Sequence, residues 1–316
     1  MIELTLPTQV HSLRSENGAD LASIFSQAGF ILSSGGVQGG QPDEWLTLEA
    51  APCTILVRPS ENGSDCWRIL APLPWPGSVD RALWSRTLLG ANGGLMRHAC
   101  MAFALDDLDV LVLSGRLYGN AADNTSLARQ LSAFHEVWTN VYGLVNACTA
   151  SPPASADLEM FIAPHRSTSA AHQDEGNAEA TQLVIDKLME IGTDPLLACQ
   201  VAASGRIQMD DADVHIEASE DGQALLLSVT LGHALLDGEG QAALRLNGDL
   251  MDQHGIAMGH GARGHRLIAH WPCNGRPAEE FHECLMALSG LPGVLQSERT
   301  VRDPADTDFD ALMPYI

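Results

Sequence analysis

Basic residues are scarce in this chain of 316 residues, where 17 lysines and arginines stand against 40 aspartates and glutamates. The formal charge of −23 repels the phosphates of nucleic acids and the headgroups of anionic membranes. We therefore expect neither nucleic acid nor a membrane as a partner. No apolar run approaches the roughly 18 residues that a membrane-spanning helix needs. Residues 1–18 also lack the basic start and apolar core of a secretory signal.

Paired cysteines are missing as well. The seven cysteines lie scattered, and no two of them form a Cys-x-x-Cys pair. An odd count with this spacing argues against a disulfide framework and against a zinc site. It fits a reducing compartment, and we expect the cytosol.

The familiar catalytic motifs are absent: the sequence has no P-loop, no Gly-x-Ser-x-Gly elbow and no His-Glu-x-x-His. Residues 259–264 match Gly-x-Gly-x-x-Gly, but a strand-like stretch follows where a dinucleotide site needs a helix. We therefore expect no catalytic site and no cofactor, which favours a binding function.

Metal ligands also lack a usable spacing. The histidines at 254, 260, 265 and 270 place no pair on one face of a helix. The aspartates within residues 210–213 and 303–310 lack the glycine and glutamate of a calcium loop. The sequence predicts solvated turns at these places and no metal site.

Apolar periodicity outlines the first half of a chain that is long enough for two domains. We expect a helix over residues 19–28, three strands, a helix capped by Ser78 and ended by Gly93 and Gly94, two strands and a long helix. The strands are predicted near residues 45–48, 54–57, 67–70, 100–105 and 110–117, and the last helix over 127–145 after a cap at Asn124 or Thr125.

The second half repeats this order after a polar linker, residues 149–179, whose apolar island at 158–162 is a candidate edge strand. A helix over residues 181–191, strands near 214–216 and 224–231, a helix capped by Asp237, strands at 255–258 and 266–271, and a helix opened by Pro277 are predicted. Residues 293–316 are predicted to be an acidic tail.

An internal duplication accounts for this repetition. Asn92 and Asn247 lie 155 positions apart, and the apolar runs after them stay in step. The turns at residues 60–63 and 219–222 match at an offset of 159. We therefore predict an α+β fold of two tandem α-β-β-β-α-β-β-α units with antiparallel sheets, at residues 1–148 and 180–292.

A small acidic unit of this order, with Leu88-Leu89-Gly90-Ala91-Asn92 before its hairpin, resembles the class I chaperones of bacterial type III secretion. The strands at 101–105 and 110–117 and the helix over 127–145 also carry the resemblance. The second copy, with Leu244-Arg245-Leu246-Asn247, matches more weakly.

The resemblance implies that both subunits of a chaperone dimer lie in one chain, as an intramolecular pseudo-dimer that is a monomer in solution. The family uses its second helix and the following strand as the dimer contact. The matching residues are Trp84, Leu88, Leu95, Met101, Phe103, Leu246, Leu250, Ile256 and Met258.

The resemblance also implies a function: binding the extended N-terminal region of a secreted effector and keeping it competent for export. Components of the export apparatus are further candidate partners. The client-binding positions that it implies are Leu21, Ile24, Phe25, Trp45, Ile55, Val57, Trp67, Ile69, Val184, Leu188, Val214, Ile216, Leu226 and Ser228. Two alternatives stay open: a non-enzymatic regulator or scaffold that binds a folded partner, and an unrecognised α+β enzyme.

Overall fold

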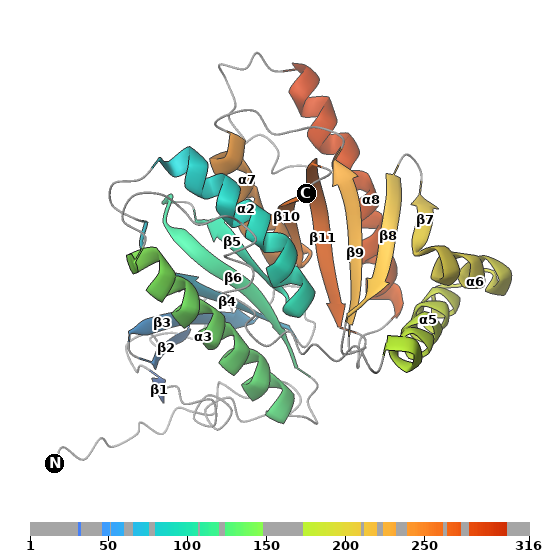
Figure 1. Cartoon of the computed structure of the whole chain (residues 1–316), viewed down its shortest axis with the longest axis horizontal. Helices are drawn as coiled ribbons and strands as arrows, with labels where there is room; N and C mark the ends of the chain where they lie inside the picture. The colour runs from blue at the N-terminus through green and yellow to red at the C-terminus, as the bar shows by residue number, and fades with distance from the viewer. Residues whose placement is uncertain are drawn as a thin grey trace.

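Two antiparallel sheets and the helices that pack on them make up the protein (Figure 1). The computed structural model describes residues 31–32, 46–50, 52–59, 66–75, 80–106, 108–119, 124–147, 173–209, 212–219, 224–231, 239–261, 264–272 and 278–301. These ranges contain six helices and eleven strands, which confirms the α+β class.

The first sheet has six strands in the order β1-β2-β3-β4-β6-β5. They are β1 (Ile31–Leu32), β2 (Leu46–Ala50), β3 (Cys53–Pro59), β4 (Cys66–Pro72), β5 (Met101–Leu105) and β6 (Leu111–Tyr118). Helix α2 (Arg81–His98) connects β4 to β5, and helix α3 (Asn124–Ala147) follows β6. The order from β2 to α3 is the predicted one; β1 was not predicted.

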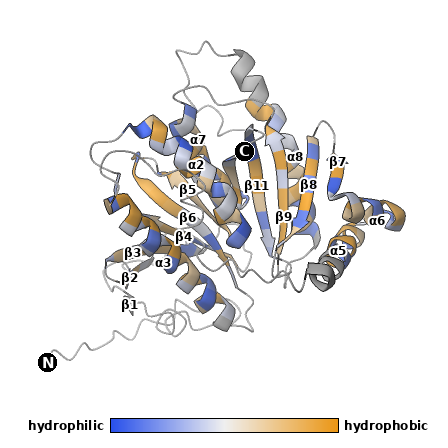
Figure 2. Cartoon of the chain, in the orientation of Figure 1, coloured by the Kyte–Doolittle hydropathy of each residue, from blue (hydrophilic) through white to orange (hydrophobic). Residues whose placement is uncertain are grey.

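Helix α3 covers one face of this sheet with the apolar stripe that its sequence predicts. Leu131, Phe134 and Trp138 are buried, since spacings of three and four residues fall on one side of a helix. The approach is close because β6 has a glycine beneath the helix: a Cβ on Gly115 would lie 3.3 Å from the Phe134 ring. Strand β6 is apolar over most of its length (Figure 2).

The second sheet has five strands in the order β10-β11-β9-β8-β7. They are β7 (Arg206–Met209), β8 (Ala212–Ala218), β9 (Ala224–Leu231), β10 (Ile256–Gly261) and β11 (Gly264–Pro272). The helices of this half are α5 (Gln173–Glu190), α6 (Pro195–Ser204), α7 (Glu239–Gln253) and α8 (Ala278–Val301). Traced from β7, the strand order is that of the first sheet traced from β2, because the sequence β-β-β-α-β-β recurs.

Helix α2 does not end at its glycines, and this prediction was wrong. It begins after Asp80, whose carboxylate accepts hydrogen bonds from the Ala82 and Leu83 amides, and continues to His98. Gly93 lies where the helix meets β10: a Cβ on Gly259 would be only 3.3 Å from the Gly93 nitrogen. The glycines allow close helix–strand packing, which outweighs their low helix propensity.

Two further boundaries differ from the prediction, and two elements were missed. Helix α5 begins at Gln173, inside the predicted linker, and α8 runs through Pro292 to Val301, inside the predicted tail. Burial of Leu288, Leu291 and Pro292 offsets the hydrogen bond that the proline removes. Helix α6 and strand β7 were not predicted at all.

Some predictions concern residues outside the described ranges. They are the helix over 19–28, the cap at Asp237, the island at 158–162, and the tail beyond residue 301. The cap predicted at Ser78 was wrong, because Asp80 caps α2. Across the described helices, none combines the length and the apolar character required to cross a membrane.

Candidate binding site at the contact between the two sheets

Helix α2 of the first half and helix α7 of the second half each pack against the edge strand of the other half. Helix α2 contacts β10, helix α7 contacts β5, and the two helices contact each other. We call this contact the seam. The nine predicted dimer-contact residues lie on these four elements and are all buried: Trp84, Leu88, Leu95, Met101, Phe103, Leu246, Leu250, Ile256 and Met258.

Two fully buried asparagines lie at the centre of the seam and make matching hydrogen bonds. The Asn92 side chain accepts from the Phe103 amide at 2.7 Å and donates to the carbonyls of Phe103 and Met258 at 3.2 and 3.1 Å. Asn247 accepts from the Met258 amide at 2.6 Å and donates to the same two carbonyls at 3.2 and 3.1 Å. Each asparagine thus ties its own strand to the strand of the other half.

Other residue pairs that lie 155 positions apart also meet across the seam. The Cys100 thiol donates to the Gly255 carbonyl at a sulfur–oxygen distance of 3.8 Å. Where α2 crosses α7, Gly240 faces Ser85 so closely that an added Cβ would lie 3.0 Å from the serine Cβ. The seam therefore brings equivalent positions of the two halves together.

Replacing Gly240 with alanine is expected to lower the free energy of unfolding by about 1–3 kcal/mol, because the added methyl group overpacks the helix crossing. Denaturant unfolding measures this loss. It should shrink when Ser85 is also changed to glycine, since the opposing Cβ is then gone. Gly143→Ala on α3 is the control, because no atom lies within 4 Å of its added Cβ. If Gly240→Ala lowered the free energy of unfolding equally with Ser85 present and with Ser85 replaced by glycine, the added methyl group would not be in contact with the Ser85 Cβ.

One side of the seam is closed by ionic contacts. Asp252 of α7 binds the guanidinium groups of Arg58 and Arg68 at 2.7 and 2.6 Å, and these arginine side chains are only 14% and 16% exposed. Arg116 donates to the carbonyls of Met251 and Asp252. Burial lowers the pKa of Arg68, and Asp252 opposes that effect. The carboxylate therefore offsets part of the positive charge that burial would otherwise make more costly.

A second ionic contact closes the same side. The Arg245 guanidinium on α7 donates to both carboxylate oxygens of Asp109 at 2.7 and 3.0 Å. Asp109 has a φ of 59° at the turn between β5 and β6. The hydrogen bond from Arg245 lowers the pKa of the Asp109 carboxyl below its usual value.

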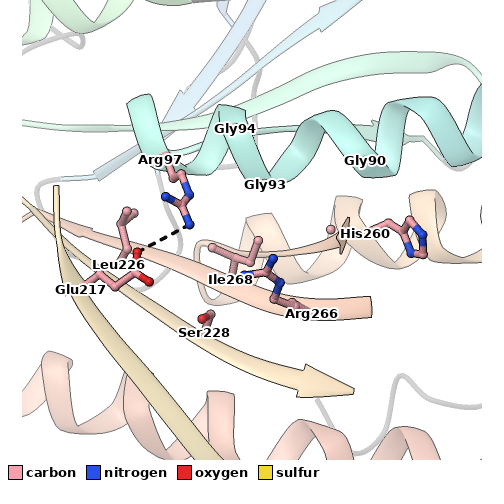
Figure 3. Close-up of a pocket in the computed structure, with 11 residues that line it drawn as sticks. Gly90, Gly93, Gly94, Arg97, Glu217, Leu226, Ser228, His260, Arg266 and Ile268 are labelled. Carbon is pink, nitrogen blue, oxygen red and sulfur yellow. Dashed lines mark ion pairs between the residues drawn. The ribbon is translucent and has the colours of Figure 1, made fainter. Parts of the chain in front are cut away.

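The opposite side of the seam is open. Here Arg97 of α2 and Glu217 of β8 approach only to 3.6 Å, and both side chains are about half exposed, at 49% and 56%. The His270 ring contacts the Met96 carbonyl at 2.8 Å. Beside these residues lies a cavity of about 200 Å³ between α2 and the second sheet, with Arg97 pointing toward Glu217 (Figure 3). The residues around it include Gly90, Arg97, Glu217, Leu226, Ser228 and Arg266.

The cavity exists because smaller side chains replace those that fill the closed side. Gly90 stands 155 positions before Arg245, which binds Asp109 on the closed side. Leu226 pairs with Glu217 across β8 and β9, as Arg68 pairs with Arg58 across β3 and β4. Glycine and leucine therefore take the places of two arginines. The cavity that results is lined by positive, negative and apolar side chains.

No family model, curated protein or solved structure matches this chain. Its function is therefore argued from the seam and the cavity.

The predicted client-binding positions lie in several different environments. Leu226 and Ser228 line the cavity. The side chains of most others are buried in the core: Ile55, Val57, Ile69, Val184, Leu188, Val214 and Ile216. Trp67 is half-buried, while Leu21, Ile24, Phe25 and Trp45 lie outside the described residues. Contact of the core group with a client stays a prediction, and it would require the core to open.

The charged residues of the seam were missed by reasoning from the sequence. Arg58 and Arg68 meet because β3 and β4 pair in one register, and Asp252 reaches them from a helix almost 200 positions later. Only the scarcity of basic residues hinted that these arginines have a specific task. Within the described part of the chain, no group of three or more histidine, cysteine or acidic side chains is placed to hold a metal ion.

Proposed function

We propose that this protein is a secretion chaperone of the bacterial cytoplasm in which two similar units form an intramolecular pseudo-dimer. It binds the extended N-terminal region of a secreted effector, keeps that region soluble and has no enzymatic activity. The paired hydrogen bonds of Asn92 and Asn247 carry the proposal. They join equivalent strands through equivalent side chains, as the two subunits of a symmetric dimer do.

The resemblance to class I chaperones of type III secretion supports this interpretation. In that family the second helix and the following strand form the dimer contact, and here the contacts of α2 with β10 and of α7 with β5 use those elements. The common strand order of the two sheets supports a tandem duplication. The domain limits that we propose are residues 1–148 and 173–301, because α5 begins at Gln173 and α8 is continuous to Val301.

The client site that we propose is the cavity and the adjoining part of the second sheet that α2 leaves uncovered. Leu226 and Ser228 line the cavity, and Glu217 and Thr230 on the neighbouring strand positions are exposed. An extended segment can place apolar side chains in such a groove and polar groups at its rim. The formal charge of −23 favours a client with basic or aggregation-prone segments.

Coexpression with the product of a neighbouring gene tests the proposal. We expect an otherwise insoluble protein to copurify with the chain, and its N-terminal segment to be protected from protease. Turnover of a small molecule by the isolated chain, with no unfolded segment bound, would overturn the proposal in favour of an enzyme.

A pair of serine variants tests the position of the client. Ser228→Arg places a long charged side chain in the cavity, so the amount of copurified client should fall several-fold. Ser132→Arg on the exposed side of α3 adds the same side chain elsewhere and should leave capture unchanged. If both variants copurified equal amounts of client, the cavity would not be the client site, and the site would lie on another surface.

A scaffold that binds a folded partner is the second candidate, and one observation favours it. Met189 lies on α5, Leu196 and Leu197 lie on α6, and the two helices contact each other. The three side chains are 46%, 70% and 47% exposed. Exposed apolar groups that gather in this way often mark an interaction surface. Copurification of a folded protein without a protected N-terminal segment would support this candidate.

A further inference from the structure

The two sides of the seam carry opposite charges at equivalent positions. Asp252 of α7 corresponds to Arg97 of α2 at the offset of 155, and Arg58 of β3 corresponds to Glu217 of β8 at the offset of 159. On one side a helix carboxylate meets sheet arginines, and on the other a helix arginine meets a sheet carboxylate.

The asparagine hydrogen bonds at the centre of the seam do not distinguish one half from the other. Asn92 and Asn247 donate to the same two carbonyls, and Phe103 and Met258 have the same role in both halves. Each half would make these backbone hydrogen bonds equally well with a copy of itself. Any preference for the other half must therefore come from residues that differ.

The charged residues of the seam do differ between the two halves, and they differ in a way that disfavours pairing of like halves. If the first half paired with another first half, Arg97 would face Arg58 and Arg68 with no carboxylate between them. If the second half paired with another second half, Asp252 would face Glu217. Like charges set against each other across an interface oppose association, and they are a common means of rejecting the wrong partner.

We infer that these reversed charges are specificity determinants, which make each half of the chain pair with the other half and reject a copy of itself. The inference rests on the pseudo-dimer part of the proposed function. It extends that proposal by naming the residues that keep two chains from joining through their like halves.

Arg97→Asp tests the inference in the full-length chain. The substitution places a carboxylate at the position equivalent to Asp252, so the first half becomes complementary to its own copy. Arg97 is half exposed, and the variant is therefore expected to fold. Wild type and variants are unfolded in denaturant, refolded over a range of protein concentrations and measured by light scattering.

We expect the wild type to refold at the chain mass of 33.7 kDa and Arg97→Asp to form a species of twice that mass. The share of this species should rise with protein concentration. Arg97→Gln removes the charge without reversing it, and Arg86→Asp reverses an exposed charge elsewhere on α2; both should stay at the chain mass.

Arg97→Asp remaining at the chain mass at every concentration would overturn the inference, as would equal dimerisation of Arg97→Gln or Arg86→Asp. A wild type that itself refolds to twice the chain mass would overturn both the inference and the intramolecular pseudo-dimer. Client capture by the wild type is measured separately, so failure of the charge argument leaves the chaperone proposal standing.

Discussion

Replacing Asn92 with alanine is expected to lower the free energy of unfolding by about 3 kcal/mol. The substitution leaves the buried Phe103 amide without its 2.7 Å acceptor and removes the donor shared by the Phe103 and Met258 carbonyls. A buried donor left unsatisfied costs about 1–3 kcal/mol, and the small cavity adds to this. Asn247→Ala should cost a similar amount, because its contacts match those of Asn92.

Denaturant unfolding measures both losses, with Asn146→Ala on the exposed side of α3 as the control, expected within about 0.5 kcal/mol of the wild type. The two losses should not add in the double variant, because both asparagines donate to the same two carbonyls. If Asn92→Ala unfolded like the control, the hydrogen bonds at the centre of the seam would contribute little, and apolar packing alone would hold the two halves together.

Removing the charge of Asp252 is the second large effect. Asp252→Asn should lower the free energy of unfolding by about 3 kcal/mol, because Arg58, Arg68 and Arg116 then lie together without the carboxylate that binds two of them. The penalty is large because both arginines that bind the carboxylate are mostly removed from water. It falls at the lower end of the range for buried pairs, since the Asp252 side chain is 26% exposed.

Glu217→Gln is the matched control on the other side of the seam. Its pair with Arg97 is exposed and 3.6 Å long, so the loss should stay below about 1 kcal/mol. Raised salt should weaken the Glu217 contact more than the Asp252 cluster, because exposed charges are screened more strongly than buried ones. If Glu217→Gln and Asp252→Asn lowered the free energy of unfolding equally, the difference in burial between the two ion pairs would have no measurable effect on stability.

Periodicity in the sequence predicted most of the elements. The stripe of α3 and the alternating strands β3 and β8 each bury one face, so local spacing reports their type directly. The offset of 155 between Asn92 and Asn247 also predicted which positions correspond. The helices and strands could be predicted because each depends on residues that lie close together in the chain.

Features that depend on distant contacts were not predictable in the same way. Gly93 signals a helix end when α2 is considered alone, but the packing of α2 on β10 makes glycine useful there. The cluster around Asp252 depends on the register of β3 and β4 and on the approach of α7. The cavity arises from differences between corresponding positions, which become visible only when the two sides of the seam are compared in space.

The cavity lies on only one side of the seam, and this asymmetry depends on how the two halves are encoded. In a dimer of identical chains, one codon specifies both sides of the symmetry axis, so a glycine that opens one side opens the other. Here Gly90 and Arg245 are separate codons, and the chain keeps arginine on one side and glycine on the other. A chain fused in the way that we propose can therefore close one face for cohesion and shape the other for the client that we propose, which a symmetric dimer cannot do with a single gene.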